Sequence, residues 1–251
     1  MTALPRTWHG PVDGDVLVLA NSLGTTQRMW DGLLAELAPD VRVLTYDLPG
    51  HTGGTTEPFT FDDLVVGSLE VLDSEDVRAA TLVGVSLGGA LGVEIAARRP
   101  DLVSRLVLVN TPVRQASKDF WLDRADAVER DGLAGLAAGL PERWFPAGGA
   151  AADAIVAQFA ALDPRGYAAA CRALAELEVT AAARTVSVPT LVVSAEDDAS
   201  VPPANSVELA ALIPNAVLES VPQGGHLLPV TRPDLLADLL AASPVAFPRD
   251  R

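Results

Sequence analysis

The chain has 251 residues, which allows one large domain or two small ones, and 49% of them are hydrophobic and 20% charged, a composition that can bury a sizeable core. Its 18 basic and 33 acidic residues give a formal net charge of −15, and the sole pair of adjacent basic residues is Arg98 and Arg99. Such a field repels phosphate backbones and anionic lipid. We therefore expect neither nucleic acid nor a membrane surface as a partner.

The lone cysteine, Cys171, rules out an intramolecular disulfide and a cysteine-based zinc cluster. Because the only histidines are His9, His51 and His226, we also expect no metal site. The N-terminus has no apolar segment of signal-peptide length, and no run of about 20 apolar residues is present to span a membrane. These features predict a cytoplasmic protein.

Short apolar runs alternate with longer helical patterns along most of the chain. The runs predict strands at residues 15–20, 41–46, 80–85, 103–109, 190–194 and 216–221. The helical patterns lie at residues 30–37, 61–72, 87–98 and 232–240. Strands that are apolar on both faces and separated by helices predict an α/β fold, with a mostly parallel twisted sheet flanked by helices.

The alternation stops between residues 112 and 186, where the sequence predicts helices alone. These helices are expected at residues 118–130, 133–140, 150–162 and 165–177. An all-helical insertion between two strands would form a lid over the carboxyl ends of the strands, where open α/β sheets bind their ligands. We therefore expect a core of residues 1–111 and 187–251 with a lid subdomain of residues 112–186.

A candidate nucleophile lies in Gly84-Val85-Ser86-Leu87-Gly88, which fits Gly-x-Ser-x-Gly between a predicted strand and a predicted helix. A sharp turn of this kind strains the serine backbone and presents its hydroxyl above the sheet. The alternative is a glycine-rich turn with a helix-capping serine. A phosphate-binding loop is disfavoured because no Gly-Lys-Ser/Thr follows.

A serine hydroxyl needs a base to take its proton and a carboxylate to orient that base. His226 follows the strand at 216–221 in a Gly-Gly-His loop and is the candidate base. Glu196, Asp197 and Asp198 follow the strand at 190–194 and compete for the acid role. We favour Asp198, which lies four residues before Pro202 at the tip of the turn.

The backbone N–H groups of Leu23 and Leu87 are the candidate oxyanion donors, because one follows the first core strand and the other begins the helix after Ser86. His51 follows the second core strand, and we expect it to be a loop histidine held by local hydrogen bonds. Cys171 is expected to be a small apolar residue of the lid.

At these residues the whole chain resembles the α/β-hydrolases, and within them the 3-oxoadipate enol-lactonases of aromatic-compound catabolism. The narrower resemblance lies in Asn21-Ser22-Leu23-Gly24-Thr25 with Met29-Trp30, in Arg143-Trp144-Phe145, and in the Gly-Tyr-Ala run of residues 166–171 with its cysteine. It implies an α/β-hydrolase fold and a Ser86–His226–Asp198 triad that opens the enol-lactone through an acyl-enzyme, without a cofactor. Candidate pocket residues are Ser22, Trp121, Arg143, Trp144 and Tyr167.

The chain also departs from that family. It has Pro49 where the lactonases often have arginine, Ala175 in place of a second arginine, and Leu228-Pro229 after the histidine. These differences affect the substrate and leave the reaction type intact. The alternatives are an esterase or lactonase for another small ester, and a ligand-binding sensor with little turnover. A homo-oligomer that uses the exposed face of the lid is a further possibility.

Overall fold

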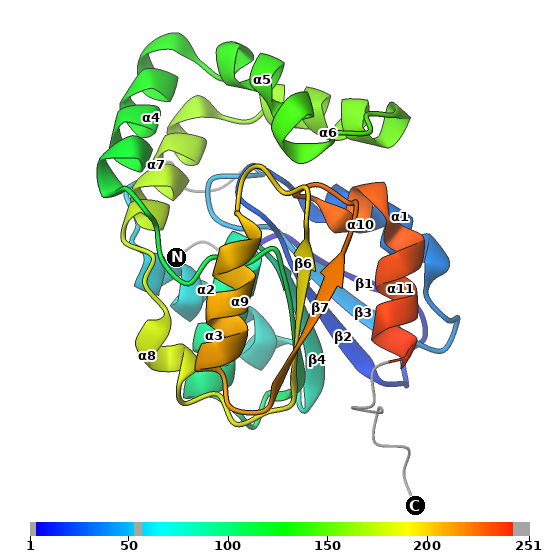
Figure 1. Ribbon diagram of the computed structural model, residues 1–251. Coiled ribbons are helices and arrows are strands. Elements are labelled where there is room, and N and C mark those ends of the chain that lie inside the picture. The colour runs from blue at the N-terminus through cyan, green and yellow to red at the C-terminus, as the bar shows by residue number, and fades with distance from the viewer. Residues whose placement is uncertain (1–3, 53–56, 243–251) are drawn as a thin grey trace, which may run out of the picture.

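The computed structural model describes residues 4–52 and 57–242, and within them seven strands form one sheet (Figure 1). The sheet order is β1-β3-β2-β4-β5-β6-β7, and all neighbours are parallel except the β1–β3 pair. The strands are β1 Arg6–His9, β2 Val16–Ala20, β3 Arg42–Tyr46, β4 Ala80–Val85, β5 Val103–Val109, β6 Thr190–Ala195 and β7 Ala216–Val221. The predicted α/β architecture is confirmed, with every predicted strand present to within two residues at either end.

The sequence prediction missed β1. This strand consists of Arg6, Thr7, Trp8 and His9, is partly exposed, and pairs antiparallel with β3 at one edge of the sheet. A short edge strand with one solvated side carries little apolar patterning, so nothing in its four residues distinguishes it from a loop.

Two groups of helices cover the two faces of the sheet (Figure 1). One group is formed by α2 Phe61–Ser74, α3 Leu87–Arg98, α8 Thr180–Ala183 and α9 Pro203–Leu212. The other is formed by η1 Gln27–Trp30, α1 Asp31–Glu36, α10 Leu228–Thr231 and α11 Pro233–Ala242. None of the helices within the described residues is long and apolar enough to cross a membrane.

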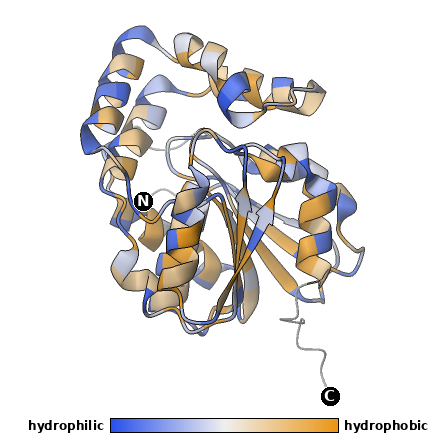
Figure 2. Ribbon diagram, in the orientation of Figure 1, coloured by the Kyte–Doolittle hydropathy of each residue, from blue (hydrophilic) through white to orange (hydrophobic). Residues whose placement is uncertain are grey.

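Four further helices lie between β5 and β6 in the sequence and above the carboxyl ends of the strands (Figure 1). They are α4 Lys118–Asp131, α5 Ala134–Trp144, α6 Ala150–Ala160 and α7 Pro164–Ala175, and we call them the lid. The strands of the sheet are mostly hydrophobic, whereas α4 is largely hydrophilic (Figure 2). We propose that the lid is a subdomain, as its position over the sheet suggests.

The lid contacts the core beside the loop that follows β2 and also at the histidine loop, where the Trp144 carbonyl oxygen accepts from the His226 N–H at 3.1 Å. Gln158 of α6 donates a hydrogen bond to Thr26, and Phe159 packs edge-on against Tyr167 of α7 at 5.1 Å between ring centroids. The Gln158 hydrogen bond joins α6 to the segment that follows β2, and the ring contact joins α6 to α7 within the lid. The lid and this segment therefore form one packed unit.

The start of α3 packs directly against the end of β2. A Cβ atom added to Gly88 would lie only 2.1 Å from the carbonyl oxygen of Ala20, which is a backbone atom and cannot rotate away. This close approach brings the end of β4, the start of α3 and the end of β2 to one point. A side chain at position 88 would force these elements apart.

We predict that Gly88→Ala lowers the free energy of unfolding by about 3 kcal/mol, because the added methyl group must displace backbone. Gly139→Ala is the matched control, since residue 139 lies inside α5 with nothing within 4 Å of the added atom. The control should raise stability by up to about 1 kcal/mol through helix propensity. Denaturant unfolding of both variants measures the difference, and equal midpoints would contradict this packing argument.

Candidate active site

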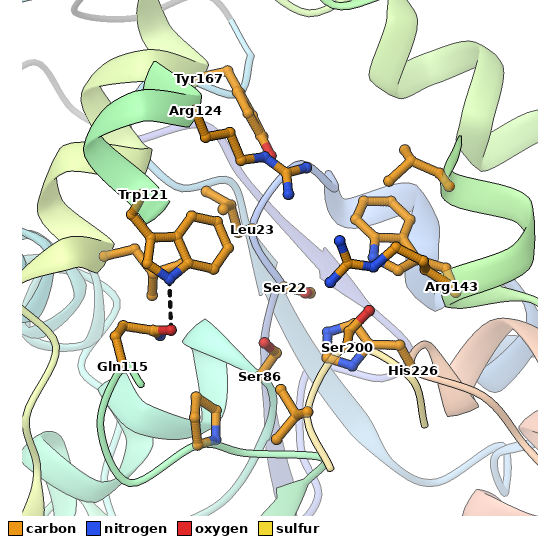
Figure 3. A pocket seen from close by; sticks show the side chains of 15 residues that line it. Ser22, Leu23, Ser86, Gln115, Trp121, Arg124, Arg143, Tyr167, Ser200 and His226 are labelled. Atoms are coloured by element: carbon orange, nitrogen blue, oxygen red, sulfur yellow. Dashed lines mark hydrogen bonds between the residues drawn. The ribbon is translucent and has the colours of Figure 1, made fainter. Parts of the chain in front are cut away.

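Ser86 lies at the junction of β4 and α3 with φ 55° and ψ −114°. A positive φ is uncommon for a residue with a side chain, and it costs free energy unless the surrounding structure imposes it. Here the Ser86 N–H donates to the carbonyl oxygen of Val109 at 2.9 Å, which fixes the turn on the neighbouring strand. The turn points the serine side chain into the pocket between the sheet and the lid (Figure 3).

His226 lies in the loop after β7, and its Nδ1 is 2.8 Å from Oδ2 of Asp198. Both residues are buried, at 3% and 5% exposure. A carboxylate oxygen accepts hydrogen bonds, so Nδ1 is the donor, and a neutral imidazole held in this way has its lone pair on Nε2. This hydrogen bond leaves Nε2 as the ring nitrogen available to the pocket, which His226 lines.

Asp198 is itself held in place by backbone donors. Its Oδ1 accepts hydrogen bonds from the N–H groups of Ser200 at 2.7 Å and Val201 at 3.0 Å. Because one oxygen is occupied by the backbone, the other is directed at His226. The turn after β6 therefore fixes the orientation of the imidazole as well as that of the carboxylate.

The other two candidate carboxylates have different partners. Oδ1 of Asp197 accepts from the N–H groups of Gly224 at 3.0 Å and Gly225 at 2.8 Å. Glu196 accepts from the hydroxyl of Ser220 at 3.0 Å. Asp197 thus braces the histidine loop through its backbone, and the structure places Asp198 against the imidazole.

Asn110 is a site residue that sequence reasoning missed. It follows β5 with φ 47°, and its Nδ2 donates to the carbonyl oxygens of Gly225 and His226, both at 2.9 Å. Its Oδ1 accepts from the N–H of Ala195 at 2.8 Å. One buried amide therefore joins the ends of β5 and β6 to the histidine loop. The available signal was an asparagine placed directly after a buried strand.

The loop of residues 21–25, which we call the oxyanion loop, follows β2. Its Ser22 carbonyl accepts from both the N–H and the hydroxyl of Thr25, at 3.2 and 2.8 Å. Leu23 lines the pocket beside Ser86, and Leu87 is the first residue of α3. The two candidate N–H donors thus belong to segments that meet at the pocket.

His51 is not held by local hydrogen bonds alone. Its Nδ1 contacts the carbonyl oxygen of Pro49 at 3.0 Å, but its Nε2 accepts from the N–H of Gly24 in the oxyanion loop at 2.7 Å. The expectation of local hydrogen bonds accounts for the first contact alone. Cys171 is buried in the lid, and burial raises the pKa of its thiol to about 12, so it stays a neutral thiol.

All five candidate pocket residues line one pocket with Ser86 and His226. Sequence reasoning missed Gln115, Arg124 and Ser200, which line it too. Gln115 accepts a hydrogen bond from the Trp121 indole N–H at 2.6 Å, and Arg124 and Arg143 reach the cavity from opposite walls (Figure 3). The side chains of Asp and Glu do not contribute to this lining among the described residues.

Two polar atoms of the pocket wall have no partner. Nε of Arg124 and Oγ of Ser200 are buried without a hydrogen bond in the described part of the chain. The Arg124 guanidinium lies 5.4 Å from the centroid of the Trp121 ring and 5.7 Å from that of the Tyr167 ring. Buried polar groups are normally hydrogen-bonded, and these two atoms are exceptions.

The model of the alpha/beta hydrolase family matches residues 17–239, which include every candidate site residue described above. This chain belongs to the alpha/beta hydrolase family. The matched range contains strands β2 to β7 of the sheet and the four helices of the lid (Figure 1).

Among its relatives, 3-oxoadipate enol-lactonase 1 of Acinetobacter baylyi is 32% identical over 76% of this chain and 74% of its own length. A Pseudomonas savastanoi protein provisionally named carbamate hydrolase RutD is 31% identical over 88% of this chain and 90% of its own. The crystal structure of an enol-lactonase from Burkholderia xenovorans superposes with a TM-score of 0.89, at 31% identity, and covers 94% of each chain. This α/β-hydrolase therefore resembles both lactone and carbamate hydrolases along nearly its whole length.

Proposed function

We propose that this α/β-hydrolase opens 3-oxoadipate enol-lactone to 3-oxoadipate. The observation that carries the proposal is the hydrogen bond from His226 to Asp198, in a pocket that also receives the strained Ser86. Nucleophile, base and orienting acid are the parts that acyl transfer by a serine hydroxyl needs. The relatives named as enol-lactonases support the lactone as the first substrate to test. A place in aromatic-compound catabolism and a cytoplasmic location belong to the same proposal.

In this mechanism, the hydroxyl of Ser86 attacks the lactone carbonyl while Nε2 of His226 takes its proton. The N–H groups of Leu23 and Leu87 hold the oxyanion of the tetrahedral intermediate. His226 then returns the proton to the departing enol oxygen, the ring opens, and the acyl group stays on Ser86. Water activated by the same imidazole releases 3-oxoadipate and restores the hydroxyl.

The charges of the pocket support an anionic substrate. The protein carries a net charge of −15, yet the guanidinium groups of Arg124 and Arg143 line the pocket, and no carboxylate among the described residues does. A carboxylate can accept charge-assisted hydrogen bonds from a guanidinium, and Arg124 and Arg143 both line this pocket. The lactonases often have arginine where this chain has Pro49 and Ala175. Arg124 supplies a positive charge in the pocket that these two positions lack.

The departures from the lactonase pattern favour a second candidate, hydrolysis of a different small ester or lactone. They leave Ser86, Asp198 and His226 in place and change only residues outside this group. A sensor with little turnover is a third outcome, which the assays below separate from the first two.

The lactone assay comes first. We predict that the wild type hydrolyses 3-oxoadipate enol-lactone, followed by loss of its ultraviolet absorbance, and that Ser86→Ala abolishes turnover and labelling by a fluorophosphonate. p-Nitrophenyl acetate is the generic comparison. Ester turnover without lactone turnover would discard the substrate and keep the serine hydrolase. Absence of turnover and of labelling in the folded wild type would favour the sensor.

For the acid, we predict that Asp198→Asn lowers kcat by about 10⁴-fold, because an amide cannot hold the imidazole in the required tautomer. Asp197→Asn is the matched control, since its amide oxygen can still accept from the N–H groups of Gly224 and Gly225. The control should keep kcat close to that of the wild type. The reverse pattern in initial rates would show that Asp198 is not the orienting acid.

For the substrate charge, we predict that Arg124→Met raises KM for the anionic lactone by about 10- to 100-fold, the value of a lost charge-assisted hydrogen bond. Methionine keeps most of the packing against Trp121 and Tyr167. KM for neutral p-nitrophenyl acetate should stay unchanged. Arg130→Met on the same helix is the control, because Arg130 pairs with Asp131 at the surface. An equal effect on both substrates would contradict charge recognition by Arg124.

A further inference from the structure

His51 is a buried histidine that the mechanism above does not use. It follows β3 and is 3% exposed, and it is not among the residues that line the pocket. Its ring nevertheless reaches the backbone of the oxyanion loop, 27 residues away in the sequence, through Gly24. The imidazole therefore connects the loop after β3 to the oxyanion loop at the edge of the site.

Its two hydrogen bonds fix the protonation of the ring. The carbonyl oxygen of Pro49 only accepts, so Nδ1 must carry a proton, and the N–H of Gly24 only donates, so Nε2 must offer a lone pair. His51 is therefore neutral in a single tautomer. Burial also lowers the pKa of the imidazole, against smaller opposite effects of the Pro49 hydrogen bond and of Asp47, and this favours the same neutral form.

The two peptide groups beside Leu23 are held from opposite ends. In the peptide that joins Ser22 to Leu23, the carbonyl accepts two hydrogen bonds from Thr25, and the Leu23 N–H of the same planar, trans group must point the opposite way. In the next peptide, the N–H of Gly24 is held by His51. With both planes fixed, the direction of the Leu23 N–H is fixed as well.

The oxyanion loop has little room to find another position. Gly24 has φ +78°, and a Cβ atom added there would lie 2.9 Å from the Phe159 ring and 3.2 Å from the Tyr167 ring of the lid. The loop thus lies between the lid and the imidazole. If the hydrogen bond to His51 is removed, nothing else among the described contacts holds the Gly24 N–H.

We infer that His51 is a positioning residue, which aligns the Leu23 N–H with the developing oxyanion by accepting a hydrogen bond from Gly24. This inference rests on the proposed serine-hydrolase function but not on the identity of the ester or lactone. In this role His51 contacts neither the substrate nor Ser86. It acts on the transition state through the backbone of the oxyanion loop, so its loss should affect kcat and spare KM.

The sharpest test compares two neutral substitutions of different reach. The amide oxygen of His51→Gln lies near the position of Nε2 and can accept from Gly24, whereas that of His51→Asn lies near Nδ1 and falls short. We expect His51→Asn to lower kcat for p-nitrophenyl acetate by about 10- to 100-fold, less than or equal to the loss of a whole oxyanion donor, with KM within about twofold. His51→Gln should recover most of the rate.

A second readout separates positioning from a loss of folding. Fluorophosphonate inactivation places a tetrahedral phosphoryl oxygen where the oxyanion forms, so its rate constant should fall in the same proportion as kcat. Rates are divided by the fraction of protein that the reagent finally labels, so an unfolded fraction does not count. Equal rates per labelled site for the wild type, His51→Asn and His51→Gln would overturn the inference.

The failures of the two proposals are distinguishable. If Ser86→Ala keeps the ester activity, the proposed function is wrong before His51 is considered. If Ser86→Ala removes the activity and both His51 variants match the wild type, the function holds and the positioning role is wrong. Equal loss of kcat in His51→Gln and His51→Asn would also overturn it, because the acceptor at the Nε2 position would then be irrelevant.

Discussion

The backbone turn at Ser86 is the constraint on which the rest of the site depends. A serine with φ 55° costs free energy unless the surrounding structure imposes this conformation. Its N–H is bound to β5, and the start of α3 is pressed against the carbonyl of Ala20 at Gly88. This turn places the Ser86 hydroxyl above the carboxyl edge of the sheet. Every other group of the site is arranged around that point.

The loops that face Ser86 are joined to each other by buried and partly buried polar contacts. Asn110 ties the ends of β5 and β6 to the histidine loop, and Asp197 braces the backbone of that loop. His51 does the same for the oxyanion loop. Each contact satisfies groups that burial would otherwise leave unpaired, and such networks hold loops rigidly. The site is therefore preorganised by side chains that the proposed chemistry does not consume.

The sign of charge changes between the surface and the pocket. Salt bridges on the outside pair many of the arginines with the acidic excess, as Arg172 does with Asp126 and Glu129. Arg124 and Arg143 instead reach the cavity, and Nε of Arg124 has no partner in the described chain. Two arginines in the pocket attract an anion locally, although the protein as a whole carries a net negative charge. The proposed carboxylated lactone fits that arrangement.

Local sequence by itself determined the core strands, the helical insertion and the candidates Ser86, Asp198 and His226, because apolar periodicity and short motifs are properties of neighbouring residues. It missed β1, whose pairing is with a distant strand, and left three carboxylates in competition for His226. Only the tertiary structure decided that Asp198 contacts His226, that Arg124 and Ser200 reach the pocket, and that His51 binds Gly24. Such contacts join segments far apart in the chain, and their partners are set by how the strand ends and the lid pack, which no local pattern encodes.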